Sequence, residues 1–189
     1  MGDLLLVTGG VRSGKSDYAL KRALAMAGHD VTFIGTARVD GDDAEMADRV
    51  ARHRAERPRA WISIDAPARA GDAIRRAPFG VVILDCVTVL TANALMREGV
   101  DDSAACYAAA GAEVDGILEA SRSRAGTLIV VTNEVGWSVH PPTAIGRWFC
   151  DVLGHANRNL AAAAIEVVLM VCGLPVVVKS ERGMASARP

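Results

Sequence analysis

The chain has 189 residues, of which 51% are hydrophobic, and it carries a formal net charge of −1. This length and composition predict one domain with a sizeable core, and the near-neutral charge argues against a general affinity for nucleic acid or anionic membranes. The four cysteines stand far apart without a CxxC pair, which argues against a zinc site or a disulfide framework and favours reduced thiols in a cytoplasmic protein.

The first apolar run, residues 4–7, predicts a strand, and it leads directly into GGVRSGKS and then a helical pattern. This motif fits the phosphate-binding pattern of Gly, four residues, Gly, Lys and Ser or Thr. Backbone N–H groups of such a loop turn toward phosphate oxygens, Lys15 is expected against the β- and γ-phosphates, and the Ser16 hydroxyl is expected on Mg²⁺. The other interpretation is a glycine-rich turn that matches by chance. The expected phosphate-binding residues are Gly9, Gly10, Val11, Arg12, Ser13, Gly14, Lys15 and Ser16.

The rest of the chain alternates between helical and strand periods. Further strands are predicted at residues 31–34, 61–64, 81–84, 128–131, 166–171 and 176–179, and helices at residues 16–27, 42–57, 67–77, 91–97, 102–124 and 143–164. This alternation indicates an α/β fold with a mainly parallel sheet and right-handed crossovers. We expect a single domain over residues 1–179 and a loose tail over residues 180–189.

No export or membrane-spanning segment is expected. Asp3 stands where a signal peptide carries basic residues. A long apolar stretch, residues 160–178, is divided by Glu166, Gly173 and Pro175. It therefore predicts a helix end and two short strands rather than a helix that crosses a bilayer.

Polar residues follow several of the predicted strands, at the edge where an open α/β sheet places its site. Asp85 follows a run typical of a buried strand and is the candidate for the acid that holds Mg²⁺, although an Asp here could also cap the next helix. Glu134 follows another such run and either faces the nucleotide or substrate or is solvated. The segment Gly35, Thr36 and Ala37 ends the second strand.

His53 lies on a polar helical pattern among four arginines. Those arginines could bind nucleotide phosphates and present the α-phosphorus to a neutral imidazole, which is a competent nucleophile. The alternative is a packed or half-exposed histidine on a helix whose arginines pair with neighbouring acids.

The chain resembles the bifunctional adenosylcobinamide kinase and adenosylcobinamide-phosphate guanylyltransferase family of cobalamin biosynthesis. The resemblance runs in order over residues 4–179, and its motifs are LVTGGVRSGKS, IGTA, EMADRVARHRAERP, VVILDCVT, VTNEVGWSVHP, GRWFCDVLGHANRNLAAAA and GLPVVVK. The first motif is shared by many enzymes, whereas TNEVG and the RxFxDxxGxxN helix are specific to this family.

The resemblance implies a RecA-like phosphate-loop NTPase fold, homotrimers, and roles for particular residues. Residues 9–16 would hold the nucleotide phosphates, Gly35, Thr36 and Ala37 would contribute to the same site, and His53 would become covalently guanylylated. The positions implied around GTP are Arg54, Ala55, Glu56, Arg57, Asp65 and Asp85. Relatives often carry Glu at the last two positions, so the shorter Asp could reach a metal through water.

The implied chemistry has two steps. ATP or GTP, with Mg²⁺, phosphorylates adenosylcobinamide, and the adenosylcobinamide phosphate then receives GMP from His53 to give adenosylcobinamide-GDP. The sequence does not show which donor is preferred or which residue takes the hydroxyl proton, for which Glu134 is a candidate.

The main alternative is a small-molecule kinase without nucleotidyl transfer, which has no use for His53. A regulatory GTPase is disfavoured because no NKxD loop occurs, and a non-catalytic ATP-binding module is excluded by any turnover.

Overall fold

The computed structural model describes residues 2–38, 48, 50–51, 54–55, 57–98, 102–137 and 139–181. Within this part of the chain, seven strands form one sheet in the order β3-β2-β4-β5-β1-β6-β7. All neighbouring pairs are parallel except β6 and β7, which are antiparallel. The strands are β1 (Asp3–Gly9), β2 (Val31–Gly35), β3 (Ile62–Asp65), β4 (Val81–Asp85), β5 (Thr127–Val131), β6 (Glu166–Val171) and β7 (Leu174–Ser180).

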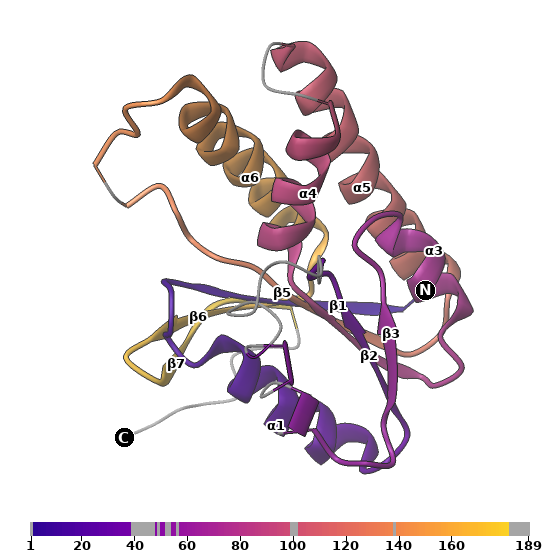
Figure 1. The fold of residues 1–189 in the computed structure, drawn as a ribbon. Helices are drawn as coiled ribbons and strands as arrows, with labels where there is room; N and C mark the ends of the chain where they lie inside the picture. Colours follow the sequence, from indigo (N-terminus) through magenta and orange to yellow (C-terminus); the bar gives the residue numbers. More distant parts are fainter. Residues whose placement is uncertain are drawn as a thin grey trace.

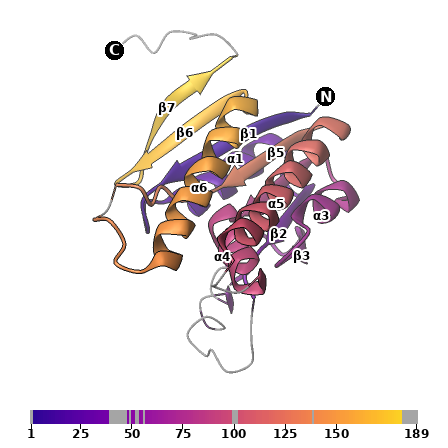
Figure 2. The same ribbon diagram turned by 90° about the horizontal axis from the view of Figure 1, so that it is seen from above.

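Helices cover both faces of the sheet (Figures 1 and 2). One face carries α1, and the opposite face carries the other four described helices. Their bounds are α1 (Lys15–Ala27), α3 (Ala70–Arg76), α4 (Val87–Glu98), α5 (Ser103–Ser123) and α6 (Ala144–Ala163). The predicted α/β fold with a mainly parallel sheet and closing C-terminal strands is confirmed.

Alternation along the strands divides the core between the two faces. In β1, Leu5 and Val7 belong to the cluster that includes Ala19 and Ala23 of α1. Leu4 and Leu6 belong to the cluster on the opposite face, which holds apolar side chains of α3, α5 and α6. Because successive side chains point to opposite sides of a strand, a strand buried on both faces reads as a continuous apolar run.

The order of the strands determines which strand ends lie beside the loop that follows β1. The loop after β1 leads directly into α1, and β5 lies between β1 and β4. The carboxyl ends of β1, β5, β4, β2 and β3 therefore share one edge of the sheet. That edge is where an open α/β sheet binds its ligands.

Several predicted boundaries were wrong. Helix α4 begins at Val87 rather than at residue 91, because burial of Val87 and Leu90 in the core outweighs the strand preference of a β-branched segment. Helix α3 begins at Ala70 rather than at residue 67, and β7 begins two residues earlier than expected. The helix predicted over residues 42–57 falls largely outside the described residues.

The C-terminal strand reaches Ser180, and the Glu181 N–H donates to the Ile165 carbonyl over 2.8 Å. Residues 182–189 of the expected tail lie outside the described residues. In the part of the chain that the structure covers, no helix has the length and apolar character that a membrane crossing requires.

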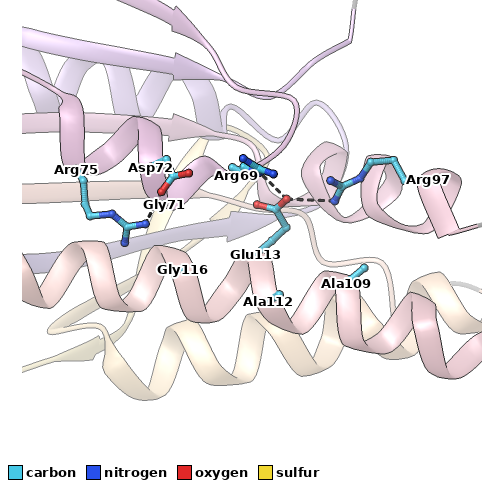
Figure 3. Close-up of a pocket in the computed structure, with 9 residues that line it drawn as sticks. All are labelled: Arg69, Gly71, Asp72, Arg75, Arg97, Ala109, Ala112, Glu113 and Gly116. Carbon is cyan, nitrogen blue, oxygen red and sulfur yellow. Dashed lines mark hydrogen bonds and ion pairs between the residues drawn. The ribbon is translucent and has the colours of Figure 1, made fainter.

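Glu113 of α5 connects α5 with α3 and α4, on the face of the sheet opposite α1 (Figure 3). Its carboxylate accepts the N–H groups of Arg69 and Ala70 at the start of α3, over 2.9 and 3.1 Å, and a guanidinium N–H of Arg97 of α4 over 3.2 Å. The side chain of Glu113 is only 8% exposed. A buried carboxylate thus takes the place of an N-cap side chain, since Arg69 provides none.

Replacing Glu113 by alanine is expected to lower the free energy of unfolding by about 3 kcal/mol, because buried N–H groups and a guanidinium lose their acceptor. For a chain of this size the melting temperature should fall by roughly 6–12 °C. The matched control is Glu119→Ala on the same helix, whose side chain is 78% exposed and whose 3.8 Å ion pair is weak. Equal melting temperatures for the two variants would contradict the role given to Glu113.

Candidate active site

The loop between β1 and α1 is shaped by two glycines. Gly9 has φ 144°, and a Cβ there would lie 2.5 Å from the Met170 carbonyl oxygen of β6. Gly14, the residue before α1, has φ 91° in the left-handed region. The turn after β6 supports the loop from outside, since the Gly173 N–H donates to the Ser13 carbonyl over 3.1 Å. Only glycine allows the chain to follow this path without strain.

Lys15 lies inside this loop rather than in solvent. Its Nζ donates to the Gly10 carbonyl over 2.6 Å and lies 3.5 Å from the Ser13 hydroxyl, and the residue is 8% exposed. The loop thus wraps around an ammonium group at the N-terminal end of α1. Such an arrangement binds anions, because the ammonium, the loop N–H groups and the helix dipole all favour negative charge.

Two of the predicted acids, Asp65 and Asp85, lie at neighbouring strand ends on the edge of the sheet that carries the loop. Parallel pairing sets Gly35 of β2 opposite both Asp65 of β3 and Asp85 of β4. Asp85 in turn pairs with Val131 of β5, which pairs with Val7 of β1, two residues before Gly9. The register therefore brings Asp65, Gly35 and Asp85 to the edge of the sheet from which the phosphate loop departs.

Asp85 does not cap the helix that follows it. Helix α4 begins at Val87, and the Leu90 N–H donates to the Cys86 carbonyl, so Cys86 stands at the helix start. Among the described residues, the Asp85 carboxylate has no hydrogen-bond partner, which leaves its oxygens available to a ligand. Burial, and to a lesser extent the charge of Asp85, raise the pKa of the Cys86 thiol to about 11, so this neighbour stays protonated near neutral pH.

Thr36 is committed to the scaffold of the site. Its hydroxyl donates to the Cys86 carbonyl over 2.7 Å and accepts the Cys86 N–H over 2.9 Å. The Asn93 amide of α4 donates to the carbonyls of Thr36 and Pro67, over 2.8 and 2.9 Å. These bonds tie the end of β2 to β4 and α4.

Glu134 lies three residues beyond β5. Because β4 stands between β2 and β5, Glu134 is on the opposite side of Asp85 from Gly35. Its N–H donates to the Gly9 carbonyl over 3.1 Å, which holds it beside the phosphate loop. Its carboxylate oxygen Oε1 accepts from the amide of Asn157, a buried residue of α6, over 2.9 Å. A lysine, the three carboxylates of Asp65, Asp85 and Glu134, and an anion-binding loop thus share one edge of the sheet, a combination suited to phosphoryl or nucleotidyl transfer.

A family model described as "Cobinamide kinase / cobinamide phosphate guanyltransferase" matches residues 5–178. The chain belongs to this family. It is therefore a transferase of cobalamin biosynthesis that combines kinase and guanylyltransferase activities.

Two curated relatives are named bifunctional adenosylcobalamin biosynthesis protein CobU. The protein from Escherichia coli is 37% identical over 93% of this chain and 99% of its own length. The protein from Salmonella typhimurium is 35% identical with the same coverage. Among solved structures, the flagellar accessory protein FlaH from Methanocaldococcus jannaschii has a TM-score of 0.47 and 15% identity over 95% of this chain and 79% of that chain.

The structure describes some of the residues that the family resemblance implies around GTP and leaves others out. Arg54 forms an ion pair with Asp65, and the Arg57 guanidinium lies 3.4 Å from the centre of the Phe33 ring. Ala55 is exposed, and His53 and Glu56 lie outside the described residues. Arg54 and Arg57 thus connect their segment to the β2 and β3 side of the site.

Sequence reasoning assigned no role to Asn93 or Asn157, which both brace the site. Asn157 lies among the buried positions of α6, beside Ala156 and in line with Leu153 and Leu160. A polar amide on the apolar face of a helix needs internal hydrogen-bond partners. Two signals were therefore available for Asn157, namely this position in the helical pattern and its place as the last residue of the RxFxDxxGxxN motif.

Proposed function

We propose that this family member phosphorylates adenosylcobinamide with ATP or GTP and then transfers GMP from GTP, through a guanylylated His53, to give adenosylcobinamide-GDP. The observation that carries this proposal is the phosphate loop closed around Lys15 beside the strand-end acids, in a chain that the family model matches over residues 5–178. Mg²⁺ is proposed as the accompanying ion.

In the phosphorylation step, the acceptor hydroxyl oxygen bonds to the γ-phosphorus while the bond from that phosphorus to the bridging oxygen breaks. The electron pair of the broken bond leaves with the nucleoside diphosphate. Lys15, released from the Gly10 carbonyl, neutralises charge that develops on the β- and γ-phosphate oxygens. The loop N–H groups of residues 9–16 hold the phosphates in line with the acceptor.

The site fits Mg²⁺ on the chemistry of its donors. Ser16 in the first turn of α1 and Asp85 at the end of β4 offer a hydroxyl and a carboxylate, which are hard oxygen ligands. The described residues contain no group of three or more His, Cys, Asp or Glu that could hold a metal by protein atoms alone. That suits an ion whose shell is completed by substrate phosphates and water. When bound, Mg²⁺ would supply charge neutralisation at those phosphates.

In the guanylylation step, the neutral imidazole of His53 attacks the α-phosphorus of GTP and pyrophosphate leaves. The phosphate of adenosylcobinamide phosphate then displaces GMP from the imidazole. The ion pair of Arg54 with Asp65 supports this role, because it ties the residue after His53 to the carboxyl end of β3. The shorter Asp65 and Asp85 side chains, where relatives often have Glu, suit contacts with the ion made through water.

We also propose that the chain acts as a homotrimer in the cytoplasm. The support for assembly is the edge strand β7, where Leu174, Val177 and Val178 are 69%, 60% and 63% exposed. An exposed apolar edge strand favours association with another chain. The mass in sedimentation equilibrium measures the number of chains.

Asp85→Asn tests the site with little change in size. If the carboxylate serves the ion, the Mg²⁺ concentration for half-maximal rate should rise about tenfold or more in both reactions, since the charge is lost. The melting temperature should change little, because the Asp85 side chain bonds to nothing in the described residues. Asp72→Asn, on the exposed side of α3, is the matched control. An unchanged Mg²⁺ requirement with a lowered melting temperature would show that Asp85 is structural.

A further inference from the structure

Glu134 occupies the position between the phosphate loop and Asp85. Strand β5 pairs with β1 on one side and with β4 on the other. Beyond the strand, the Thr132 N–H donates to the Val7 carbonyl over 3.0 Å and the Glu134 N–H donates to the Gly9 carbonyl over 3.1 Å. The chain after β5 therefore follows β1 to the start of the phosphate loop, and this fixes the backbone of Glu134 there.

The Glu134 side chain is held by an amide that has no freedom to turn. The Nδ2 group of Asn157 donates to the Asn133 carbonyl over 3.0 Å and to Glu134 Oε1 over 2.9 Å, while its Oδ1 accepts the Thr132 hydroxyl over 2.7 Å. Because a backbone carbonyl can only accept, the amide orientation is set. All three polar contacts of the buried Asn157 are thereby used to aim one carboxylate.

This arrangement engages one carboxylate oxygen and spares the other. Asn157 bonds to Oε1, and Oε2 has no hydrogen-bond partner among the described residues. The other two carboxylates of this edge differ: Asp65 is paired with Arg54, and Asp85 stands where the ion is proposed. A half-buried carboxylate that is oriented through one oxygen and open at the other is suited to accept a proton.

We propose that Glu134 is the general base of the phosphorylation step and that Asn157 is its positioning residue. The inference rests on the phosphorylation step of the proposed function. The acceptor hydroxyl gives its proton to Glu134 Oε2 as its oxygen bonds to the γ-phosphorus, and the nucleoside diphosphate leaves with the electron pair of the broken phosphorus–oxygen bond. The protonated Glu134 then returns its proton to water. Guanylylation of an imidazole nitrogen that carries no proton needs no such base.

Glu134→Gln is the first test, since glutamine keeps the oxygen that Asn157 binds and removes the basic one. The kcat for cobinamide phosphorylation should fall about a hundredfold or more, with KM for both substrates within about threefold. Formation of the protein–GMP adduct from GTP should change by less than about threefold. The matched control is Glu119→Gln, which exchanges an exposed carboxylate on α5 and should leave both rates unchanged.

Glu134→Ala provides a second test that does not depend on the glutamine variant. The cavity left by the side chain should admit formate, and added formate should raise the phosphorylation rate of this variant but not that of the wild type. Melting temperatures of all variants are measured in parallel, so that rates are compared only where the protein is folded.

Asn157 is tested by its dependence on Glu134. Asn157→Ala should lower the kcat for phosphorylation about tenfold while KM stays within about threefold, whereas Asn159→Ala, two residues along α6, should have no effect. In the Glu134→Gln background, Asn157→Ala should cause no further loss, because the base it positions is gone.

The inference is overturned if Glu134→Gln keeps phosphorylation within threefold of wild type, if it lowers both reactions equally, or if formate does not accelerate the alanine variant. Losses that multiply in the double variant would show that Asn157 acts independently of Glu134. A wild-type chain that does not phosphorylate cobinamide would instead contradict the proposed function itself, so the two failures are distinguishable.

Discussion

Lys15→Ala is expected to depress phosphorylation and guanylyl transfer together, each on the order of a thousandfold. The Lys15 ammonium lies within the phosphate loop and donates to the Gly10 carbonyl. From there it can exchange this acceptor for the β- and γ-phosphate oxygens of either nucleotide. Both reactions develop negative charge on those phosphates, so both lose the same stabilisation. Initial rates of each half-reaction at saturating nucleotide give the measurement.

Lys21→Ala is the matched control for this experiment. Lys21 lies on the same helix, but its side chain is 74% exposed and pairs with Asp17 four residues earlier. An exposed ion pair of this kind contributes little to the free energy of unfolding, and Lys21 lies outside the phosphate loop. Both rates and the melting temperature should therefore stay near those of the wild type. A Lys15→Ala variant with a near wild-type rate in either reaction would show that the nucleotide binds elsewhere.

His53→Ala is expected to abolish guanylyl transfer and to leave phosphorylation of adenosylcobinamide largely intact. The γ-phosphoryl step depends on Lys15, the phosphate loop and the ion, whereas the second step needs a nucleophilic imidazole. Phosphorylated product should therefore accumulate without conversion to adenosylcobinamide-GDP. Product analysis by mass, with adenosylcobinamide as acceptor, distinguishes the two compounds.

His29→Ala is the control, since His29 is an exposed histidine outside the site. If the His53 variant still forms adenosylcobinamide-GDP, or loses both activities to the same extent, His53 is not the acceptor of GMP. The small-molecule kinase interpretation, which has no use for this histidine, would then replace the bifunctional one.

The strand-end residues could be predicted from the sequence because their placement follows from local rules. A continuous apolar run followed directly by Asp85, or by Thr132, Asn133 and Glu134, predicts a buried parallel strand with polar side chains at its carboxyl end. Since parallel strands all point the same way, those ends meet at one edge. The phosphate loop was predictable for the same reason, because glycine spacing between a strand and a helix fixes its path.

The start of α4 and the braces of the site could not be predicted in this way. Residues 87–89 are all β-branched, which favours a strand. They form the start of α4 instead, because this places Val87 and Leu90 in the core against the sheet. Asn93 and Asn157 contact residues 57 and 24 positions away in the chain, Thr36 and Asn133. Such contacts depend on the strand order, which local patterns do not contain. The role proposed for Glu134 depends on its hydrogen bond with Asn157, which is one of these contacts.

One chain is proposed both to phosphorylate its substrate and to carry GMP on His53. The most direct test of this proposal is incubation of the wild-type protein with Mg²⁺ and GTP labelled at the α-phosphate, followed by peptide mapping by mass. One GMP is expected on the peptide that contains His53, through a bond that is labile in acid and persistent in alkali, as is typical of a phosphoramidate. Absence of an adduct, or a label that survives acid on a serine or threonine, would contradict this proposal.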